Sequence, residues 1–294
     1  MPIDYATLKA WPFTDVRQHY TPRDTILYAL GVGAGRGCDA PDSAALRYVY
    51  EEALRAIPAM AVVLGYPGFW LRDPASGIDW RAVLHVEQDV VLHRPLASSG
   101  TVIGRNRVEE VYDRGPGRGA VMITCRELVD ADSDAPIASL RCTEFCRGEG
   151  GFGGPPPLPR QLDTMPSRSP DDELTLHVDE RAALIYRLCG DDNPLHVDAA
   201  VARSVGLDRP ILHGLCTFGM ATYALMRCLF PDDTGTVRRI KTRLTSPVFP
   251  GERLCVDVWR EGEGDARFRV RAPERGVIVM DSGLFVYEPA FSNT

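Results

Sequence analysis

One short run of the sequence gathers side chains that are used in acid–base chemistry. Residues 190–196 contain Asp191, Asn193 and His196, and Pro194 stiffens the chain between them. A carboxylate and an imidazole held this close together can share one water molecule, take a proton from it and deliver a proton elsewhere. The same run is also typical of a simple turn, because Asp-x-Asn-Pro is common turn chemistry. A catalytic role therefore depends on what lies nearby.

A second feature begins 14 residues after Leu195. Residues 209–215 read RPILHGL and open a long apolar stretch, so we expect a helix to begin near Gly214. The first N–H groups of a helix have no partner within it, and they lie at the positive end of the helix dipole. Glycine also lets a ligand approach the backbone closely. A free amide beside an acid–base pair suits chemistry next to a carbonyl group.

Composition indicates an ordinary soluble globular protein. The 294 residues are 45% hydrophobic and 25% charged, and the formal net charge is -7. An acidic chain without long runs of like charge argues against a nucleic-acid partner or an anionic membrane surface. No apolar run reaches the roughly 18 residues of a membrane span, and the N-terminus lacks a secretory signal. We therefore expect a cytoplasmic protein with no membrane partner.

The eight cysteines predict neither a disulfide framework nor a metal site. Cys216 and Cys228 lie in an apolar helix-like run, and Cys142 and Cys146 stand at even spacing in a strand-like run. No Cys-x-x-Cys pair occurs in the sequence. These residues are typical of small buried hydrophobes in a reducing compartment. We expect no metal and no cofactor.

The order of motifs repeats along the chain. Tyr28 begins YALGVG and Tyr186 begins YRLCGD, and a proline–glycine element follows each at a similar distance, at Pro95 and Pro247. Strand-like residues come after both elements. Matched order and spacing predict an internal duplication, although the residue identity is weak and chance similarity remains the alternative. The first half has Gly33 where the second has Asp191, so it lacks the acid–base run.

Breaker residues separate the two halves. Residues 148–154 hold five glycines, and prolines stand at 155, 156, 157 and 159. No regular element persists through such a stretch. We place a first domain at residues 1–154, a linker at 155–170 and a second domain at 171–294.

The second half predicts one buried helix and a series of strands. Residues 215–230 are apolar on nearly every side, which is typical of a helix buried all round. A shorter helix is expected at 180–188, and a shorter apolar core at 57–64 occupies the matching place in the first half. One buried helix followed by antiparallel strands implies a curled sheet wrapped round that helix. The expected strands are 102–112, 121–129, 254–259, 268–270 and 277–286.

On these motifs the chain resembles the MaoC-like hydratases, in particular the double-hot-dog (R)-specific 2-enoyl-CoA hydratases (hydratase 2). In the second half the resemblance rests on YRLxGDxNPLHxD from Tyr186, PILHGLCTFG from Pro210 and PVxPG from Pro247. In the first half it rests on YALGVG from Tyr28, the pair Tyr50-Glu51, VLHxEQ from residue 83 and GGFGG at 150–154. The resemblance implies an α+β fold with two antiparallel sheets, each wrapped round a hydrophobic helix and joined into one pseudo-dimer.

The resemblance also implies a reaction, the reversible hydration of trans-2-enoyl-CoA to (3R)-3-hydroxyacyl-CoA. Carried over to matching positions, Asp191 and His196 are the acid–base pair and Asn193 helps to hold the water. Gly214 supplies the backbone N–H that accepts the negative charge of the thioester oxygen. The degenerate first half is implied to accommodate the acyl chain. This chemistry needs no metal or cofactor.

Supporting residues are implied with less direct roles. His213 positions the loop, Glu51 matches a carboxylate that is linked to activity, and Tyr28 and Tyr186 pack near the site. The basic residues Arg239, Lys241 and Arg243 are candidates for the CoA phosphates, although a basic strand face is more often solvated. The remaining histidines are expected to be structural: His19, His85, His93 and His177.

Other functions remain open at this level. The nearest is the reverse reaction, a dehydratase of a branched, dicarboxylic or steroid-derived 3-hydroxyacyl thioester. A hot-dog thioesterase would hydrolyse the thioester instead. A non-catalytic acyl-CoA-binding subunit would have no use for the acid–base pair. The sequence is compatible with a monomer or a homodimer.

Overall fold

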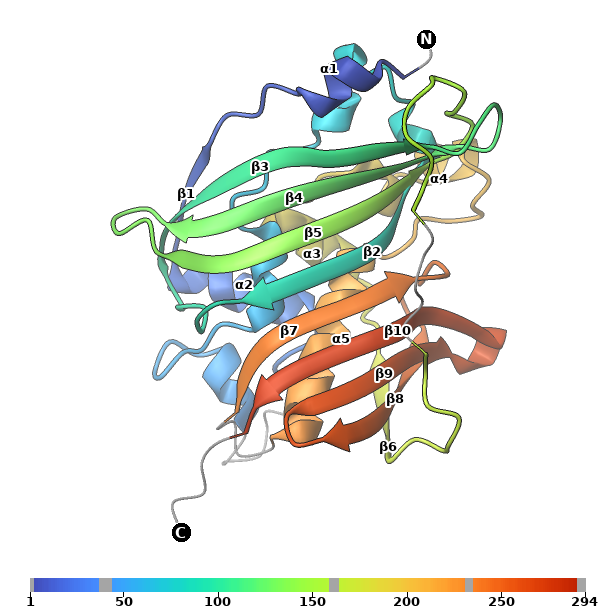
Figure 1. The fold of residues 1–294 in the computed structure, drawn as a ribbon. Helices are drawn as coiled ribbons and strands as arrows, with labels where there is room; N and C mark the ends of the chain where they lie inside the picture. Colours follow the sequence, from blue (N-terminus) through green and yellow to red (C-terminus); the bar gives the residue numbers. More distant parts are fainter. Residues whose placement is uncertain (1–2, 37–43, 159–163, 231–234, 290–294) are drawn as a thin grey trace.

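A single curved sheet organises the protein. The computed structural model describes residues 3–36, 44–158, 164–230 and 235–289. The described strands form one 10-stranded sheet in the order β1-β3-β4-β5-β2-β7-β10-β9-β8-β6, with antiparallel pairing throughout (Figure 1). The first half supplies β1 (Val16–Tyr20), β2 (Val83–Leu92), β3 (Gly100–Asp113), β4 (Ala120–Asp130) and β5 (Pro136–Cys146). The second half supplies β6 (Asp172–His177), β7 (Thr236–Leu244), β8 (Arg253–Gly262), β9 (Asp265–Ala272) and β10 (Val277–Glu288).

The two halves meet edge to edge. β2 pairs antiparallel with β7, in a register that places Glu87 opposite Arg243 and Val91 opposite Arg239. One hydrophobic core also runs through both halves and includes Tyr28 and Met60 of the first half and Phe218 of the second. The predicted pair of sheets is therefore one continuous sheet built from two five-stranded units.

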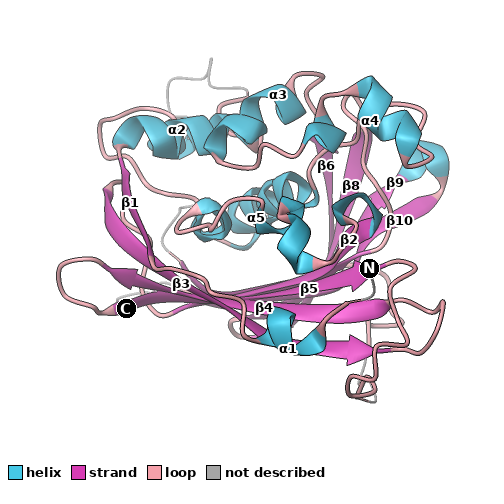
Figure 2. Cartoon of the chain, turned by 90° about the horizontal axis from the view of Figure 1, so that it is seen from above, coloured by secondary structure: helices cyan, strands magenta, loops and turns pink. Residues whose placement is uncertain are grey.

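Helix α5 (Gly214–Leu229) lies inside the curve of the sheet. Seen from above, α2 (Pro22–Gly31) and α3 (Ala182–Tyr186) lie on the other side of α5 (Figure 2). The middle of α5 is buried all round, from Cys216 to Thr222, which confirms the helix predicted at 215–230. The remaining α-helices of the described chain are α1 (Tyr5–Lys9) and α4 (Ala199–Ser204). None of the described helices is both long and apolar enough to cross a membrane.

Local sequence explains where two of these helices begin and end. α2 starts with Pro22 in its first turn, behind a capping box in which Thr21 and Asp24 satisfy one another's backbone and side-chain groups. The helix predicted at 180–188 is shorter than expected. It is α3 followed by a 3-10 turn at Arg187–Cys189, and Gly190 then turns the chain with a φ of 122°.

The first half has no counterpart to α5 among its described residues. The apolar core predicted at 57–64 forms a short 3-10 helix at Pro58–Val63. Gly65 ends it with a φ of 60°, and this turn lies directly on β3. A Cβ atom added to Gly104 would lie 2.6 Å from the Gly65 Cα. Because backbone meets backbone here, a side chain at either glycine would clash with the facing chain.

The chain between the halves is irregular where it is described. β5 ends at Cys146 and β6 begins at Asp172, and the described residues between them, 147–158 and 164–171, are in neither helix nor strand. Residues 159–163 of the predicted linker lie outside the described part. The boundaries at 154 and 170 remain a prediction.

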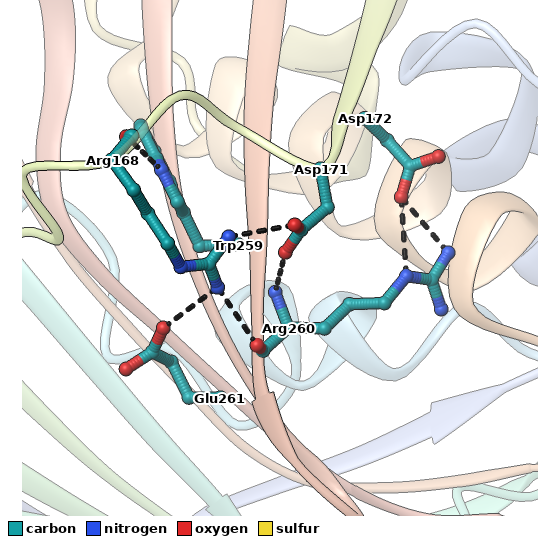
Figure 3. A network of polar contacts seen from close by, with 6 residues as sticks. All are labelled: Arg168, Asp171, Asp172, Trp259, Arg260 and Glu261. Carbon is teal, nitrogen blue, oxygen red and sulfur yellow. Dashed lines mark hydrogen bonds and ion pairs between the residues drawn. The ribbon is translucent and has the colours of Figure 1, made fainter.

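The end of this segment is fixed against β8 by a polar network (Figure 3). The Arg168 guanidinium contacts the Asp171 carboxylate at 2.6 Å and the Glu261 carboxylate at 3.0 Å. Arg168 also donates to the Arg260 carbonyl oxygen at 2.9 Å, while its own carbonyl accepts from the Trp259 indole at 2.9 Å. These contacts hold the entry to the second half in one place.

Candidate active site

A tight loop after α3 carries the acid–base residues. Gly190 takes a positive φ that glycine tolerates best, and the chain then enters the run that starts at Asp191. The Asn193 side-chain oxygen accepts from the Leu195 N–H at 3.1 Å and so caps the 3-10 helix Pro194–His196. The Asn193 N–H in turn lies 3.3 Å from Asp191 Oδ1. The loop is therefore organised by its own side chains.

Asp191, His196 and His213 come together as the spacing predicted. One polar side-chain atom from each of the three lies within 4.8 Å of the other two. The rings of His196 and His213 stack with their centroids 3.7 Å apart. His213 Nε2 lies 3.3 Å from the Asp191 main-chain carbonyl oxygen, so this histidine holds the loop in position.

The tautomer of His196 follows from its backbone contact. His196 Nδ1 lies 3.0 Å from the Ile211 carbonyl oxygen. Since a carbonyl can only accept, Nδ1 carries the proton and the neutral ring presents Nε2 as an acceptor. The pair thus offers two acceptors for the hydrogens of a water molecule, a carboxylate oxygen of Asp191 and Nε2 of His196.

Burial shifts the protonation equilibria of all three groups. It raises the pKa of Asp191, and the attraction of His196 opposes that rise. It lowers the pKa of His196, which Asp191 opposes in the same way. Burial, with a smaller contribution from His196, lowers the pKa of His213 to about 2. His213 is therefore neutral, and Asp191 and His196 share their proton equilibrium as a pair.

Gly214 is the first residue of α5, directly after His213. Its N–H belongs to the first turn and has no acceptor within the helix. A Cβ atom added to Gly214 would lie 2.7 Å from Leu244 Cδ1, so the space beside this residue is already filled on that side. Gly214, Asp191 and His196 border the same cavity, and the role of the Gly214 N–H as a donor stays a prediction.

A cavity of about 460 Å³ connects this centre with the first half. That volume falls within the range of roughly 300–1,000 Å³ for small-molecule sites. Asp191, His196 and Gly214 border it from the second half. The lining from the first half includes Tyr66 and Glu144. The site is therefore built jointly by the two halves.

Tyr28 and Tyr186 lie behind the centre rather than in the cavity lining. The Tyr186 ring packs 5.0 Å from the His213 ring and 5.9 Å from the Tyr28 ring, measured between centroids. Both hydroxyl groups are buried without a hydrogen-bond partner among the described residues. Their position supports a packing role next to His213.

Glu51 is separated from the site. It is exposed, it follows the 3-10 helix Ala44–Tyr48, and it does not border the cavity. This position does not favour the supporting role expected for Glu51. The motif match at Tyr50-Glu51 indicated family membership but gave no information on where the side chain lies.

The basic residues of β7 also lie away from the cavity. Arg239, Lys241 and Arg243 alternate along the strand with the buried Ile240 and Thr242. Alternate side chains of a strand point to opposite faces, so the three face away from α5. Arg239 also forms a two-point ion pair with the carboxylate of Asp89, at 2.6 and 2.9 Å. Their place outside the cavity lining does not support the expectation that these residues meet CoA. Arg81, Arg107 and Arg147 border the cavity instead.

Sequence reasoning missed the polar groups that the first half brings to the cavity. Tyr66, Arg126 and Glu144 border it, and so does His85, which was expected to be purely structural. One signal was present in the sequence. Glu144 stands midway between Cys142 and Cys146, and the even spacing of those cysteines on a strand places Glu144 on their face.

The Asp191, His196 and His213 group also has the side-chain types of a metal site. An acid–base pair next to a helix N-terminus accounts for the same residues, with His213 engaged by the Asp191 backbone. The acid–base interpretation of these residues requires no metal ion.

Comparison with known proteins agrees with this geometry. Residues 161–282 match the model of the MaoC like domain, and residues 18–148 match the MFE-2 hydratase 2 N-terminal domain. The chain is 37% identical to 3-hydroxyacyl-thioester dehydratase Y of Mycobacterium tuberculosis, covering 91% of this chain and 93% of that protein. It is 35% identical to enoyl-CoA hydratase ChsH3 of the same organism, covering 97% and 98%.

The chain belongs to the MaoC-like hydratase family. A solved MaoC-like dehydratase from Phytophthora capsici superposes with a TM-score of 0.82 at 33% identity, covering 97% of this chain and 98% of that one. The fold is the double hot-dog of this MaoC-like family, as the resemblance implied. Its relatives are named for adding or removing water, and this MaoC-like protein is a hydro-lyase.

Proposed function

We propose that this protein catalyses the reversible hydration of trans-2-enoyl-CoA to (3R)-3-hydroxyacyl-CoA. The observation that carries the proposal is the meeting of three groups in one cavity: the Asp191 carboxylate, the acceptor Nε2 of His196 and the first N–H of α5 at Gly214. Each answers one need of the reaction. A base must take a proton from water, an acid must deliver one to C2, and a donor must stabilise the thioester oxygen.

The reaction proceeds from one water molecule. The water donates one hydrogen to Asp191 and the other to Nε2 of His196. One of these two groups takes a proton as the hydroxide oxygen bonds to C3. The C2–C3 π electrons move to give an enolate, whose negative charge on the thioester oxygen is stabilised by the Gly214 N–H. The enolate then collapses as C2 receives the proton from the pair, which returns to its starting state.

General principles indicate how much each group contributes. Acid–base catalysis by a positioned side chain is worth roughly 10²–10⁴-fold, and a backbone donor aimed at an oxyanion contributes about 3–4 kcal/mol. Because the pair delivers both hydroxyl and proton from its own side of the substrate, addition is syn. The (3R) configuration and the roles of the residues are parts of this proposal.

We further propose how the substrate lies. The cavity extends from Asp191 into the first half, so the acyl group points toward Val62 and Val63 of the 3-10 helix Pro58–Val63. Arg81, Arg107 and Arg147, which border the cavity, are the candidates for the CoA phosphates. The dehydratase reaction is the same chemistry in reverse, and substrate supply decides the direction of flux. A cytoplasmic location and homodimer formation remain predictions.

A spectroscopic assay tests the function. We expect that the purified protein removes the absorbance of the conjugated thioester when given crotonyl-CoA or trans-2-decenoyl-CoA. Chiral chromatography of the product should give the (3R) alcohol. Release of free CoA thiol would support a thioesterase instead. Binding of enoyl-CoA with no change in absorbance or thiol would support a non-catalytic subunit, and formation of the (3S) product would contradict the proposed geometry.

A further inference from the structure

Glu144 is a buried carboxyl group that the proposed reaction does not use. It lies on β5 of the first half and borders the cavity, so the residue is half-buried, but its Oε2 atom is shielded from solvent. This oxygen has no hydrogen-bond partner among the described residues. Of the buried side-chain atoms that lack a partner in the described chain, it is the one that belongs to a cavity-lining residue.

The neighbouring polar groups of the first half are already engaged. Arg126 donates to the carbonyl oxygens of Val62 and Leu64 at 2.9 and 2.8 Å and to Asn106 Oδ1 at 3.0 Å. Its guanidinium carbon lies 5.2 Å from the centre of the Tyr66 ring. Arg126 therefore holds the turn that follows the 3-10 helix, and it does not neutralise Glu144.

His85 does not satisfy Glu144 either. The two residues are direct partners in the β2–β5 register, which puts their side chains on one face of the sheet. His85 Nε2 lies 3.1 Å from the Glu87 carbonyl oxygen and so donates there. Burial lowers the pKa of His85 to about 4, so the ring is neutral and supplies no charge. Burial also raises the pKa of Glu144 to about 7.

An orphaned carboxyl group in a cavity has a cost that a ligand can remove. A buried polar group without a partner destabilises the folded protein. Protein atoms cover Oε2, so a ligand becomes its partner only when the carboxyl group turns toward the cavity that Glu144 borders. The lining of the cavity as a whole is more apolar than polar, and it includes Val62, Val63 and Leu140 from the first half. The matching ligand is therefore a largely apolar group that carries one hydrogen-bonding atom.

We propose that Glu144 is a specificity residue that hydrogen-bonds a hydroxyl or keto oxygen on the acyl group of the substrate. This inference rests on the proposed hydratase function. A protonated Glu144 donates to a keto oxygen, and either form of the group accepts from a hydroxyl. The preferred substrate is thus an oxygenated, otherwise apolar enoyl thioester rather than a plain fatty acyl chain.

A substrate-swap experiment tests this inference. The probes are trans-2-decenoyl-CoA and a series of the same compound with one hydroxyl or keto group at each position from C5 to C9. We expect wild-type kcat/KM to be highest for one oxygenated member of the series. In Glu144→Leu its advantage over the plain compound falls at least about 10-fold, because the oxygen loses its partner. Glu144→Gln keeps a hydrogen-bonding group and retains most of the preference.

A control variant and a melting curve separate this role from a structural one. Glu127 lies on the neighbouring strand β4 and bonds to Ser139, away from the cavity lining. Glu127→Leu should leave the substrate preference unchanged. Glu144→Leu should melt at the same temperature as wild type or higher, since it removes an unpartnered buried carboxyl group.

The outcomes distinguish the two proposals. If wild type hydrates none of the enoyl-CoA compounds, the proposed function fails and this inference fails with it. If wild type hydrates them but Glu144→Leu changes all rates equally, or melts lower and loses all activity, only the role of Glu144 is overturned. A preference for the plain compound in wild type would also overturn it.

Discussion

The two halves each contribute five strands to the sheet, but they differ in the helix that packs against those strands. The second half packs the 16-residue helix α5 inside its strands. The first half has a 3-10 helix of 6 residues in the corresponding place, and two of them, Val62 and Val63, border the cavity. Because the 3-10 helix of the first half is short, the cavity extends from the second half into the first.

The acid–base centre shows the same asymmetry. At the position of Asp191 the first half has Gly33, whose φ is 85° and whose added Cβ would meet nothing within 4 Å. No long helix begins nearby among the described residues to supply a donor like Gly214. A duplication therefore keeps the sheet, which both halves must pair, and is free to change the helix and loops, which only one active site needs.

Removing the acid–base pair should give the largest effect. Asp191→Asn and His196→Gln each replace a group that can take a proton from the water by an amide that cannot, so we expect hydration rates to fall roughly 10²–10⁴-fold. Circular dichroism should show an unchanged fold. Gly33→Asp added to Asp191→Asn should restore nothing, because the first half lacks a matching histidine and helix start. Near wild-type turnover in either single variant would contradict the mechanism.

The pH dependence of activity tests whether Asp191 and His196 act together as the acid–base pair. The active state needs both acceptors unprotonated, so activity falls as pH decreases and the pair takes up a proton. Burial raises the pKa of Asp191 from 3.8 and lowers that of His196 from 6.5. The acid limb of kcat/KM should therefore report the pair as a whole and change in both Asp191→Asn and His196→Gln. An acid limb that is the same in either variant would indicate that another group controls the reaction.

Alanine at two glycines compares how tightly each half is packed. At Gly104 the added Cβ meets the backbone of Gly65, at 2.6 Å from its Cα, whereas at Gly214 it meets the flexible end of Leu244. Backbone cannot yield as a side chain can, so Gly104→Ala should lower the free energy of unfolding by about 1–3 kcal/mol. Gly214→Ala should cost less. Urea denaturation measures both, and equal losses would contradict the contrast.

The paired tyrosines should give the smallest effect. The Tyr28 and Tyr186 hydroxyls are buried without a partner among the described residues. Tyr28→Phe and Tyr186→Phe should therefore change the free energy of unfolding by no more than about 0.5 kcal/mol, with any change toward higher stability. Thermal melts test this. A clear loss of stability in one variant only would show that the hydroxyls are not equivalent in the two halves.

Sequence predicted best where one physical pattern dominates. Residues 215–230 are apolar on nearly every side, and α5 agrees with that prediction to within one residue at each end. Asp191, His196 and Gly214 were singled out from two short motifs, and all three border one cavity, while their catalytic roles stay a prediction. The helix at 180–188 was overextended, since the chain tightens into a 3-10 turn before Gly190.

Features set by tertiary contacts were harder to predict. Glu144 of the first half and Asp191 of the second border the same cavity, and no local motif in the sequence records that they meet there. The position of Arg239 and Lys241 outside the cavity lining could have been predicted. Their alternation with Ile240 and Thr242 already placed them on the opposite face of the strand. Motif matches, as at Glu51, identified the family without locating the side chain.

The pairing of β2 with β7 fixes the spacing between the two halves of the cavity. The backbone register across this seam, from Glu87 opposite Arg243 to Val91 opposite Arg239, sets how far the first half's wall lies from the acid–base pair. A slip of one residue would turn every side chain of a strand to the wrong face, so the span cannot adjust in small steps. A change in preference for longer or shorter acyl groups must therefore come from substitutions of individual side chains that line the cavity.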